Sequence, residues 1–168
     1  MDLRKSLFQL EQLSPRLARK LWELTPLMSA PLTLVMGFKV KLLTDTSVEV
    51  EIPYGRQNRN EVGQLQSSVL IAAAEYASNM LWKRHLNPEL DQVRLEALQS
   101  QFFKPAFSAV RVRASLGEIE REKVLRKIRS GEEVTCELSV VVTDEKDQTV
   151  ASVNGHWILK TLRPLALG

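Results

Sequence analysis

The sequence has few of the residue types from which most metal and redox sites are built. Its 168 residues include one cysteine, Cys136, and two histidines, His85 and His156. A single cysteine excludes an internal disulfide and a cysteine-based metal cluster. The two histidines are far apart in the sequence and do not form the close pairs that are typical of zinc ligands. We therefore expect neither a metal nor another cofactor.

Glycines, aromatic residues and an excess of one charge are also scarce. The seven glycines do not cluster, which excludes a glycine-rich phosphate-binding loop. Aromatic residues make up 6% of the chain, so the sequence offers no stacking platform for nucleic acid bases. Lysine and arginine outnumber aspartate and glutamate by only 23 to 20 and are interleaved with them. Nucleic acid is therefore not an expected partner.

Long uninterrupted hydrophobic runs are absent as well. The segment "MDLRKSLFQLEQL" carries Asp2 and Glu11, which is not typical of a signal peptide. Even the most apolar segment, residues 62–82, contains several polar side chains, so we expect no membrane span. Because 44% of the residues are hydrophobic, the chain can form one sizeable core. The sequence predicts a cytoplasmic protein.

Residues 3–24 have the periodicity of helices. Leucines recur at steps of three and four residues, and Ser14-Pro15 is typical of a helix N-cap followed by proline at the first helical position. The basic residues among them form either a solvated face or a contact surface for a membrane or an acidic partner. We expect a helical N-terminal extension over residues 1–30, followed by one domain over residues 31–168.

A period of two then predicts strands. Apolar residues alternate from Leu34 to Leu42 and from Val48 to Ile52, which indicates two strands joined near Thr44-Asp45. Cys136 shares one face of a later strand with four apolar residues, so we expect a small core residue there rather than a reactive thiol. The later strands are expected near residues 92–104, 107–116, 133–143 and 149–160.

Two helices are expected between these strands. Residues 64–83 are too long for a strand and lack proline and glycine, which predicts a nearly fully buried helix. The charged segment "GEIEREKVLRKIRSG" has a short apolar stripe and predicts a surface helix that ends at Gly131. The order of elements is typical of an α+β fold, in which an antiparallel sheet wraps around one long helix.

The segment "NEVGQLQSS" and the Glu75 that follows it resemble a motif of thioesterases with the hot-dog fold. That motif is Asn-x-x-Gly-x-x-His-Gly-Gly, with an acidic residue nine positions after the histidine. Asn60, Gly63 and Glu75 match it, whereas "QSS" stands where the family has His-Gly-Gly. The segments "QFFKPA" and "VASVNGHWILK" resemble the third and the final strand of the family. The resemblance extends over residues 31–160.

The resemblance implies catalytic roles for three residues. Glu75 would be the general base or the nucleophile, the backbone N–H of Ser67 would donate to the oxyanion, and Asn60 would orient water or the substrate carbonyl. Each has a structural alternative. A lone glutamate can pair with an arginine at an interface, an asparagine can form a turn or cap a helix, and Ser67 can be a small packing residue at the helix start. The expected substrate contacts are Gly63, Gln66, Ser68, Arg56 and Arg59, the two arginines with the phosphates of coenzyme A.

The spacing of the motif makes a dimer plausible. Nine helical residues at about 100° each turn through about 900°, so Gln66 and Glu75 point to opposite sides of one helix. Two copies around a two-fold axis can bring both groups to one substrate, and the family builds its sites in this way. We expect a homodimer or a dimer of dimers that hydrolyses acyl thioesters of coenzyme A or of an acyl carrier.

The alternative to this enzyme is a non-catalytic hot-dog protein that binds an acyl or acyl-CoA ligand. The replacement of His-Gly-Gly by "QSS" favours this alternative, because glutamine cannot take up a proton. A hydratase or dehydratase on the same fold is less favoured, since that chemistry uses a histidine and none lies near the motif.

Overall fold

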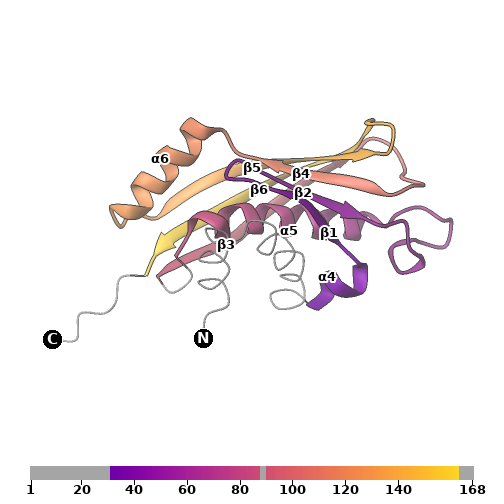
Figure 1. Ribbon diagram of the computed structural model, residues 1–168, viewed down its shortest axis with the longest axis horizontal. Helices are drawn as coiled ribbons and strands as arrows, with labels where there is room; N and C mark the ends of the chain where they lie inside the picture. Colours follow the sequence, from indigo (N-terminus) through magenta and orange to yellow (C-terminus); the bar gives the residue numbers. More distant parts are fainter. Residues whose placement is uncertain (1–30, 88–89, 163–168) are drawn as a thin grey trace, which may run out of the picture.

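The computed structural model describes residues 31–87 and 90–162, so the helices expected over residues 3–24 lie outside the described part of the chain. The elements, labelled as in Figure 1, are α4 (Pro31–Met36), β1 (Lys39–Leu43), β2 (Ser47–Ile52), the 3-10 helix η1 (Arg56–Asn58), α5 (Ser67–His85), β3 (Asp91–Phe102), β4 (Val110–Ser115), α6 (Glu118–Arg129), β5 (Val134–Asp144) and β6 (Thr149–Thr161).

The six strands form one antiparallel sheet in the order β1-β2-β4-β5-β6-β3, and α5 lies along one face of it (Figure 1). The expected architecture, an antiparallel sheet around one long helix, is therefore confirmed. The two outer strands differ in length, since β3 has 12 residues and β1 has five.

The alternation of apolar and polar residues builds the core between the sheet and α5. In β5, every second residue from Val134 to Val142, Cys136 among them, is buried, and the residues between them up to Val141 are exposed. On the helix, Ala73, Ala74 and Ala77 are fully buried. Small side chains at these positions allow the backbone of α5 to lie close to the sheet. The large residues of the core include Trp82 and Trp157.

The strand expected from Leu34 onwards is wrong at its beginning. Residues 31–36 form α4, and β1 begins only at Lys39. Proline is favoured in the first turn of a helix, and Gly37, with φ +69°, ends the helix in the left-handed conformation. The N–H of Gly37 donates to the carbonyl oxygen of Leu34 at 2.9 Å, and that of Phe38 to the carbonyl oxygen of Thr33 at 3.1 Å.

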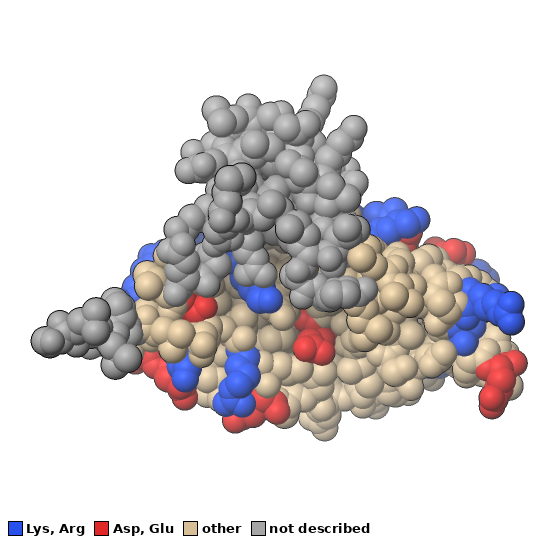
Figure 2. Space-filling model, turned by 90° about the horizontal axis from the view of Figure 1, so that it is seen from below, with Lys and Arg blue, Asp and Glu red and all other residues tan. Residues whose placement is uncertain are grey.

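The structure confirms the positions of the two helices expected between the strands, but the first of them is less buried than expected. The expected helix over residues 64–83 is α5, but Ser67, Ser68 and Glu75 are exposed, so the expectation of near-complete burial is wrong for one face. The expected surface helix is α6, and Gly131 follows its end with φ +83°. Figure 2 shows basic and acidic side chains interspersed on the face seen from below, with no large area of one charge.

No helix within residues 31–87 and 90–162 combines the length and the hydropathy that a membrane-spanning segment requires.

We predict that the Cys136 thiol is unreactive in the folded protein. Burial raises its pKa to about 12, and the charge of Glu120 adds to this effect. A thiol-specific reagent at pH 8 should react with native Cys136 at least about 100-fold more slowly than with the urea-unfolded chain, since the thiolate is the reactive form. A Cys136→Ala, Thr135→Cys variant is the control, because Thr135 is exposed on the same strand. Rapid reaction of native Cys136 would contradict the buried position.

Candidate functional site

The start of α5 is fixed by hydrogen bonds to the loop that precedes it. Gln66 is the N-cap residue of the helix, in an extended conformation. Its backbone N–H donates to the carbonyl oxygen of Asn58 at 2.9 Å, and its side-chain Nε2 donates to the carbonyl oxygen of Arg59 at 3.1 Å. The amide group of Gln66 therefore holds the loop in place. Gln66 therefore has a structural role at the position where the thioesterase motif has histidine.

Asn58 anchors the same loop to the rest of the fold. Its side chain is fully buried, and its Nδ2 donates to the carbonyl oxygens of Met36 at 2.8 Å and of Pro53 at 2.9 Å. These bonds tie the loop to the ends of α4 and β2. This role could not be predicted from the sequence, because an asparagine in "YGRQNRN" has the pattern of an ordinary loop residue.

Asn60 closes the turn before the helix. Its Oδ1 accepts hydrogen bonds from the N–H groups of Val62 at 3.1 Å and of Gln64 at 2.9 Å. Gly63 has φ +81°, a conformation that favours glycine, and its carbonyl oxygen accepts a hydrogen bond from the Tyr54 hydroxyl. Asn60 and Gly63, which match the motif, therefore form a turn in this chain. For Asn60 this is the structural alternative that the sequence predicted.

A groove of about 400 Å³ opens beside the start of α5. It is lined by Asn60, Gln64, Leu65, Ser67, Leu70, Phe102, Phe103, Lys104, Pro105 and Ala106. The fold therefore brings "NEVGQLQSS" and "QFFKPA", two segments about 40 residues apart in sequence, to one place. Phe102 and Phe103 are 44% and 53% exposed, so the groove has an apolar rim that is open to solvent. The first N–H groups of a helix have no partner within it, and Ser67 lies at this end.

Lys104 holds one wall of the groove in place. Its Nζ lies 2.6 Å from Asp144 Oδ2 and also donates to Gln148 Oε1, which ties the segment after β3 to the hairpin between β5 and β6. This hydrogen bond from Lys104 lowers the pKa of the Asp144 carboxyl group. The resemblance had singled out the segment but gave the lysine no role, because its partners lie 40 and 44 residues further along the chain.

Glu75 does not line this groove. It lies eight residues after Ser67 on α5, about 12 Å along the helix axis, and its side chain is exposed in the single chain. The expectation of a nearly fully buried helix is therefore wrong at Glu75. No ion pair joins it to another residue within the described parts of the chain.

The remaining expected contacts do not meet at one point either. Ser68 is exposed seven positions before Glu75, which places the two side chains within about 20° of each other around the helix. Arg56 is exposed in η1. The Arg59 guanidinium lies 4.8 Å from the centre of the Tyr54 ring, so it stacks on that ring. Within one chain, only Asn60 and Ser67 of the expected site residues line the groove.

His156 lies away from this groove, on β6. Its Nδ1 is 3.5 Å from Glu137 Oε1 on the neighbouring strand, so its contact is with a cross-strand partner and not with the groove. Among residues 31–87 and 90–162, no three side chains of His, Cys, Asp and Glu gather so that they could hold a metal ion.

Solved structures share this architecture. A protein of unknown function from Pseudomonas aeruginosa, described as a probable thioesterase, has a TM-score of 0.77 at 20% identity, over 88% of this chain and 95% of that one. A thioesterase from Haemophilus influenzae has a TM-score of 0.66 at 16% identity, over 85% and 92% of the two chains. These likenesses show the fold, which is the hot-dog fold.

A thioesterase from Staphylococcus aureus has a TM-score of 0.64 at 14% identity, over 78% of this chain and 99% of that one. It has been solved with a glutamine replaced by alanine and, in a second structure, with a glutamate replaced by alanine. The chain itself belongs to the family described as a domain of unknown function, DUF4442, which matches residues 19–159. No curated protein matches it significantly in sequence.

We predict that Gln66→Met destabilises the protein, because the Arg59 carbonyl oxygen loses the hydrogen bond that Gln66 Nε2 donates to it. The free energy of unfolding should fall by about 0.5–1.5 kcal/mol in urea titrations. Gln64→Met is the matched control, since no side-chain hydrogen bond of Gln64 is present within the described residues. An equal loss in both variants would contradict the role of Gln66 in fixing the loop.

Proposed function

We propose that the chain hydrolyses acyl thioesters, with acyl-CoA as the substrate, at a site formed by two copies of the chain. The observation that carries the proposal is the groove at the start of α5, where Ser67 and Asn60 face an open rim that includes Phe102 and Phe103. Its place on a hot-dog fold shared with proteins described as thioesterases supports the same function.

The helix start supplies the electrophilic part of the site. The unpaired N–H groups and the positive end of the helix dipole favour an oxygen that gains negative charge, as a thioester carbonyl does when it is attacked. The donor in our proposal is the N–H of Ser67, which serine retains in place of glycine. Ser67 and Ser68 are both exposed, which leaves this end of α5 open to a substrate.

Glu75 of the second copy supplies the base. Its carboxylate takes a proton from water, and the resulting hydroxide attacks the carbonyl carbon. The C–S bond then breaks, the acyl group leaves as the carboxylic acid, and the sulfur takes the proton back from Glu75 to become the thiol. The S. aureus relative supports Asn60 and Glu75 as residues of the proposed site, since its two substituted positions, a glutamine and a glutamate, are 15 residues apart, as positions 60 and 75 are here.

The long edge strand β3 supports the proposed dimer. An unpaired strand edge exposes a row of N–H and C=O groups, and pairing with a second copy satisfies them. β3 offers 12 residues for such pairing, whereas β1 at the opposite edge has five and an irregular register between Val40 and Leu42. In a two-fold pair of β3 strands, the two α5 helices lie on the same side of one continuous sheet.

A second candidate function is the binding of an acyl or acyl-CoA ligand without catalysis. The observation that favours it is the Nε2 contact of Gln66 with the Arg59 carbonyl oxygen. This contact occupies the side chain in the place of the family histidine, and glutamine cannot transfer a proton. Binding without turnover would raise the free energy of unfolding by about 2.7 kcal/mol at a ligand concentration of 100 times Kd.

We predict that wild-type protein releases free thiol from at least one acyl-CoA of a panel from short to long and aromatic chains. Glu75→Gln should lower kcat by at least about 100-fold, because the amide cannot accept the proton of water. Glu61→Gln, at an exposed position in the loop before α5, is the control and should keep full activity. Full activity of Glu75→Gln would refute the assigned base, and stabilisation without turnover would favour the binding function.

Two complementary variants test whether the site is shared. Ser67→Pro removes only the N–H donor, because proline is tolerated at the first position of a helix and Gln66 before it is already extended. Each variant alone should be nearly inactive, with kcat about 100-fold to 1,000-fold lower for Ser67→Pro. An equal mixture of Ser67→Pro and Glu75→Gln chains, unfolded and refolded together, should recover about a quarter of the wild-type activity, since half of the dimers carry one intact site of two. No recovery would place both groups in one chain and overturn the shared site.

A further inference from the structure

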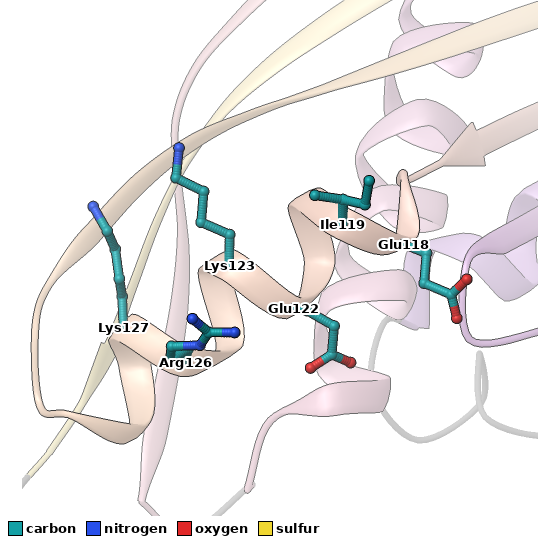
Figure 3. Close-up of a pocket in the computed structure, with 6 residues that line it drawn as sticks. All are labelled: Glu118, Ile119, Glu122, Lys123, Arg126 and Lys127. Atoms are coloured by element: carbon teal, nitrogen blue, oxygen red, sulfur yellow. The ribbon is translucent and has the colours of Figure 1, made fainter.

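The helix α6 is an insertion between β4 and β5 whose outer surface carries a cluster of cations. Val124, Leu125 and Ile128 bury its inner face against the sheet. Two rows of side chains at four-residue steps flank a shallow groove of about 530 Å³ on the outer face (Figure 3). One row consists of Ile119, Lys123 and Lys127, and the other of Glu118, Glu122 and Arg126.

The charges on these rows are separated along the helix. In the first half, Arg121 forms ion pairs with Glu118 at 3.6 Å and with Glu122 at 2.8 Å. In the second half, Lys123, Arg126 and Lys127 form no ion pair within the described residues. Residues three and four apart are neighbours on a helix, so these three cations lie within one turn and close to one another.

This charge distribution also stabilises the helix dipole, so it does not by itself require a ligand. The position of α6 in the fold is the second observation. The Thr161 hydroxyl lies 3.1 Å from the carbonyl oxygen of Ile128 and 2.7 Å from Asp91 Oδ1. It therefore joins the end of α6 to the first residue of β3.

The proposed dimer brings this end of α6 close to the groove of the second copy. When two β3 strands pair antiparallel, Asp91 of one copy lies near Phe102 of the other, and the groove lining continues from Phe102 to Lys104. The end of α6 is packed against β6, which is one strand from the β3 edge. Two strand spacings, about 10 Å, then separate it from β3 of the second copy.

We propose that Lys123, Arg126 and Lys127 of α6 bind the nucleotide phosphates of coenzyme A while the acyl group occupies the groove of the second copy. This inference rests on the proposed thioesterase function and its dimer. Three cations in one turn match a compact group of phosphates. A broad acidic protein surface fits less well, because it would also meet Glu118, Glu120 and Glu122 on the same helix. The pantetheine arm of coenzyme A bridges the distance between phosphates and thioester.

The test compares two double variants with the same change of charge. Lys123→Gln with Lys127→Gln removes two of the three cations and keeps good helix formers. Lys39→Gln with Lys41→Gln removes two exposed lysines from β1, at the opposite edge of the sheet. Calorimetry with coenzyme A itself should give a Kd about tenfold weaker for the α6 variant and unchanged for the β1 variant. The difference should shrink at high salt, since exposed charges are screened.

Kinetics with two substrates provide the second measurement. An acyl-CoA and the matching acyl-pantetheine share the thioester but differ in the nucleotide. The ratio of KM for acyl-CoA to KM for acyl-pantetheine should rise about tenfold in the α6 variant relative to wild type. Circular dichroism checks that the helix content of the variant is retained.

Each outcome decides between the claims. Equal affinity of wild type and the α6 variant for coenzyme A overturns the inference and leaves the thioesterase function to its own test. Wild-type protein that does not bind coenzyme A but hydrolyses an acyl group on an acidic carrier protein overturns it in favour of that carrier. Neither binding nor turnover overturns both the inference and the proposed function.

A mixed dimer tests which groove α6 serves. Glu75→Gln chains are refolded with chains that carry Lys123→Gln and Lys127→Gln. In the active site of the hybrid, the groove belongs to the Glu75→Gln chain, whereas Glu75 and α6 belong to the chain with the two lysine substitutions. The hybrid should therefore have the raised KM for acyl-CoA. A wild-type KM would show that α6 acts on the groove of its own chain and would overturn the placement across the dimer.

Discussion

The packing of α5 against the sheet is the constraint on which the rest of the molecule depends. Fully buried alanines, Ala73, Ala74 and Ala77, bring the helix close to the strands, and Trp82 fills the core beside them. Because a helix can bury only one side against a single sheet, the exposed residues Ser68 and Glu75 of α5 lie on its opposite side. The same packing fixes where the helix begins, so its first N–H groups lie beside the segment that follows β3. The core and the candidate site therefore share one element.

The sequence predicted the fold well where one period dominates over a long segment. The alternation in β5 and the length of α5 left no competing interpretation. It failed for residues 34–36, because alternate apolar residues in so short a segment fit a strand and a helix equally well. The decisive signals there were local ones, Pro31 and Gly37. The site was predicted in part for a related reason. Asn60 and Ser67 belong to a contiguous motif, whereas Asn58 and Lys104 act through partners that only the tertiary structure brings near them.

The departures from the motif of the hot-dog thioesterases fall on side chains and leave the backbone chemistry of the helix start available. The side-chain amide of Gln66 donates a hydrogen bond to the Arg59 carbonyl oxygen. This bond holds the loop in place and takes no part in a proton transfer. Serine keeps the backbone N–H that glycine would supply. In the proposed mechanism the electrostatic part of catalysis therefore depends on the fold, through the position of the helix start, and the proton transfer depends on a single carboxylate. This division explains how the sequence of the motif can change while its geometry is retained.

Several features of the single chain are costly when they are considered separately. Within residues 31–87 and 90–162, β3 is a 12-residue edge strand with one unpaired edge, and Phe102 and Phe103 expose aromatic surface at its end. Glu75 stands alone on an otherwise weakly polar helix face, and the cations of α6 lie in one turn next to the start of the same edge strand. In the proposed dimer, one two-fold operation at the β3 edge would pair the strand, cover the aromatic rim and bring carboxylate and cations to the groove of the other copy. The proposed second copy would account for all of them together, whereas a monomer needs a separate reason for each.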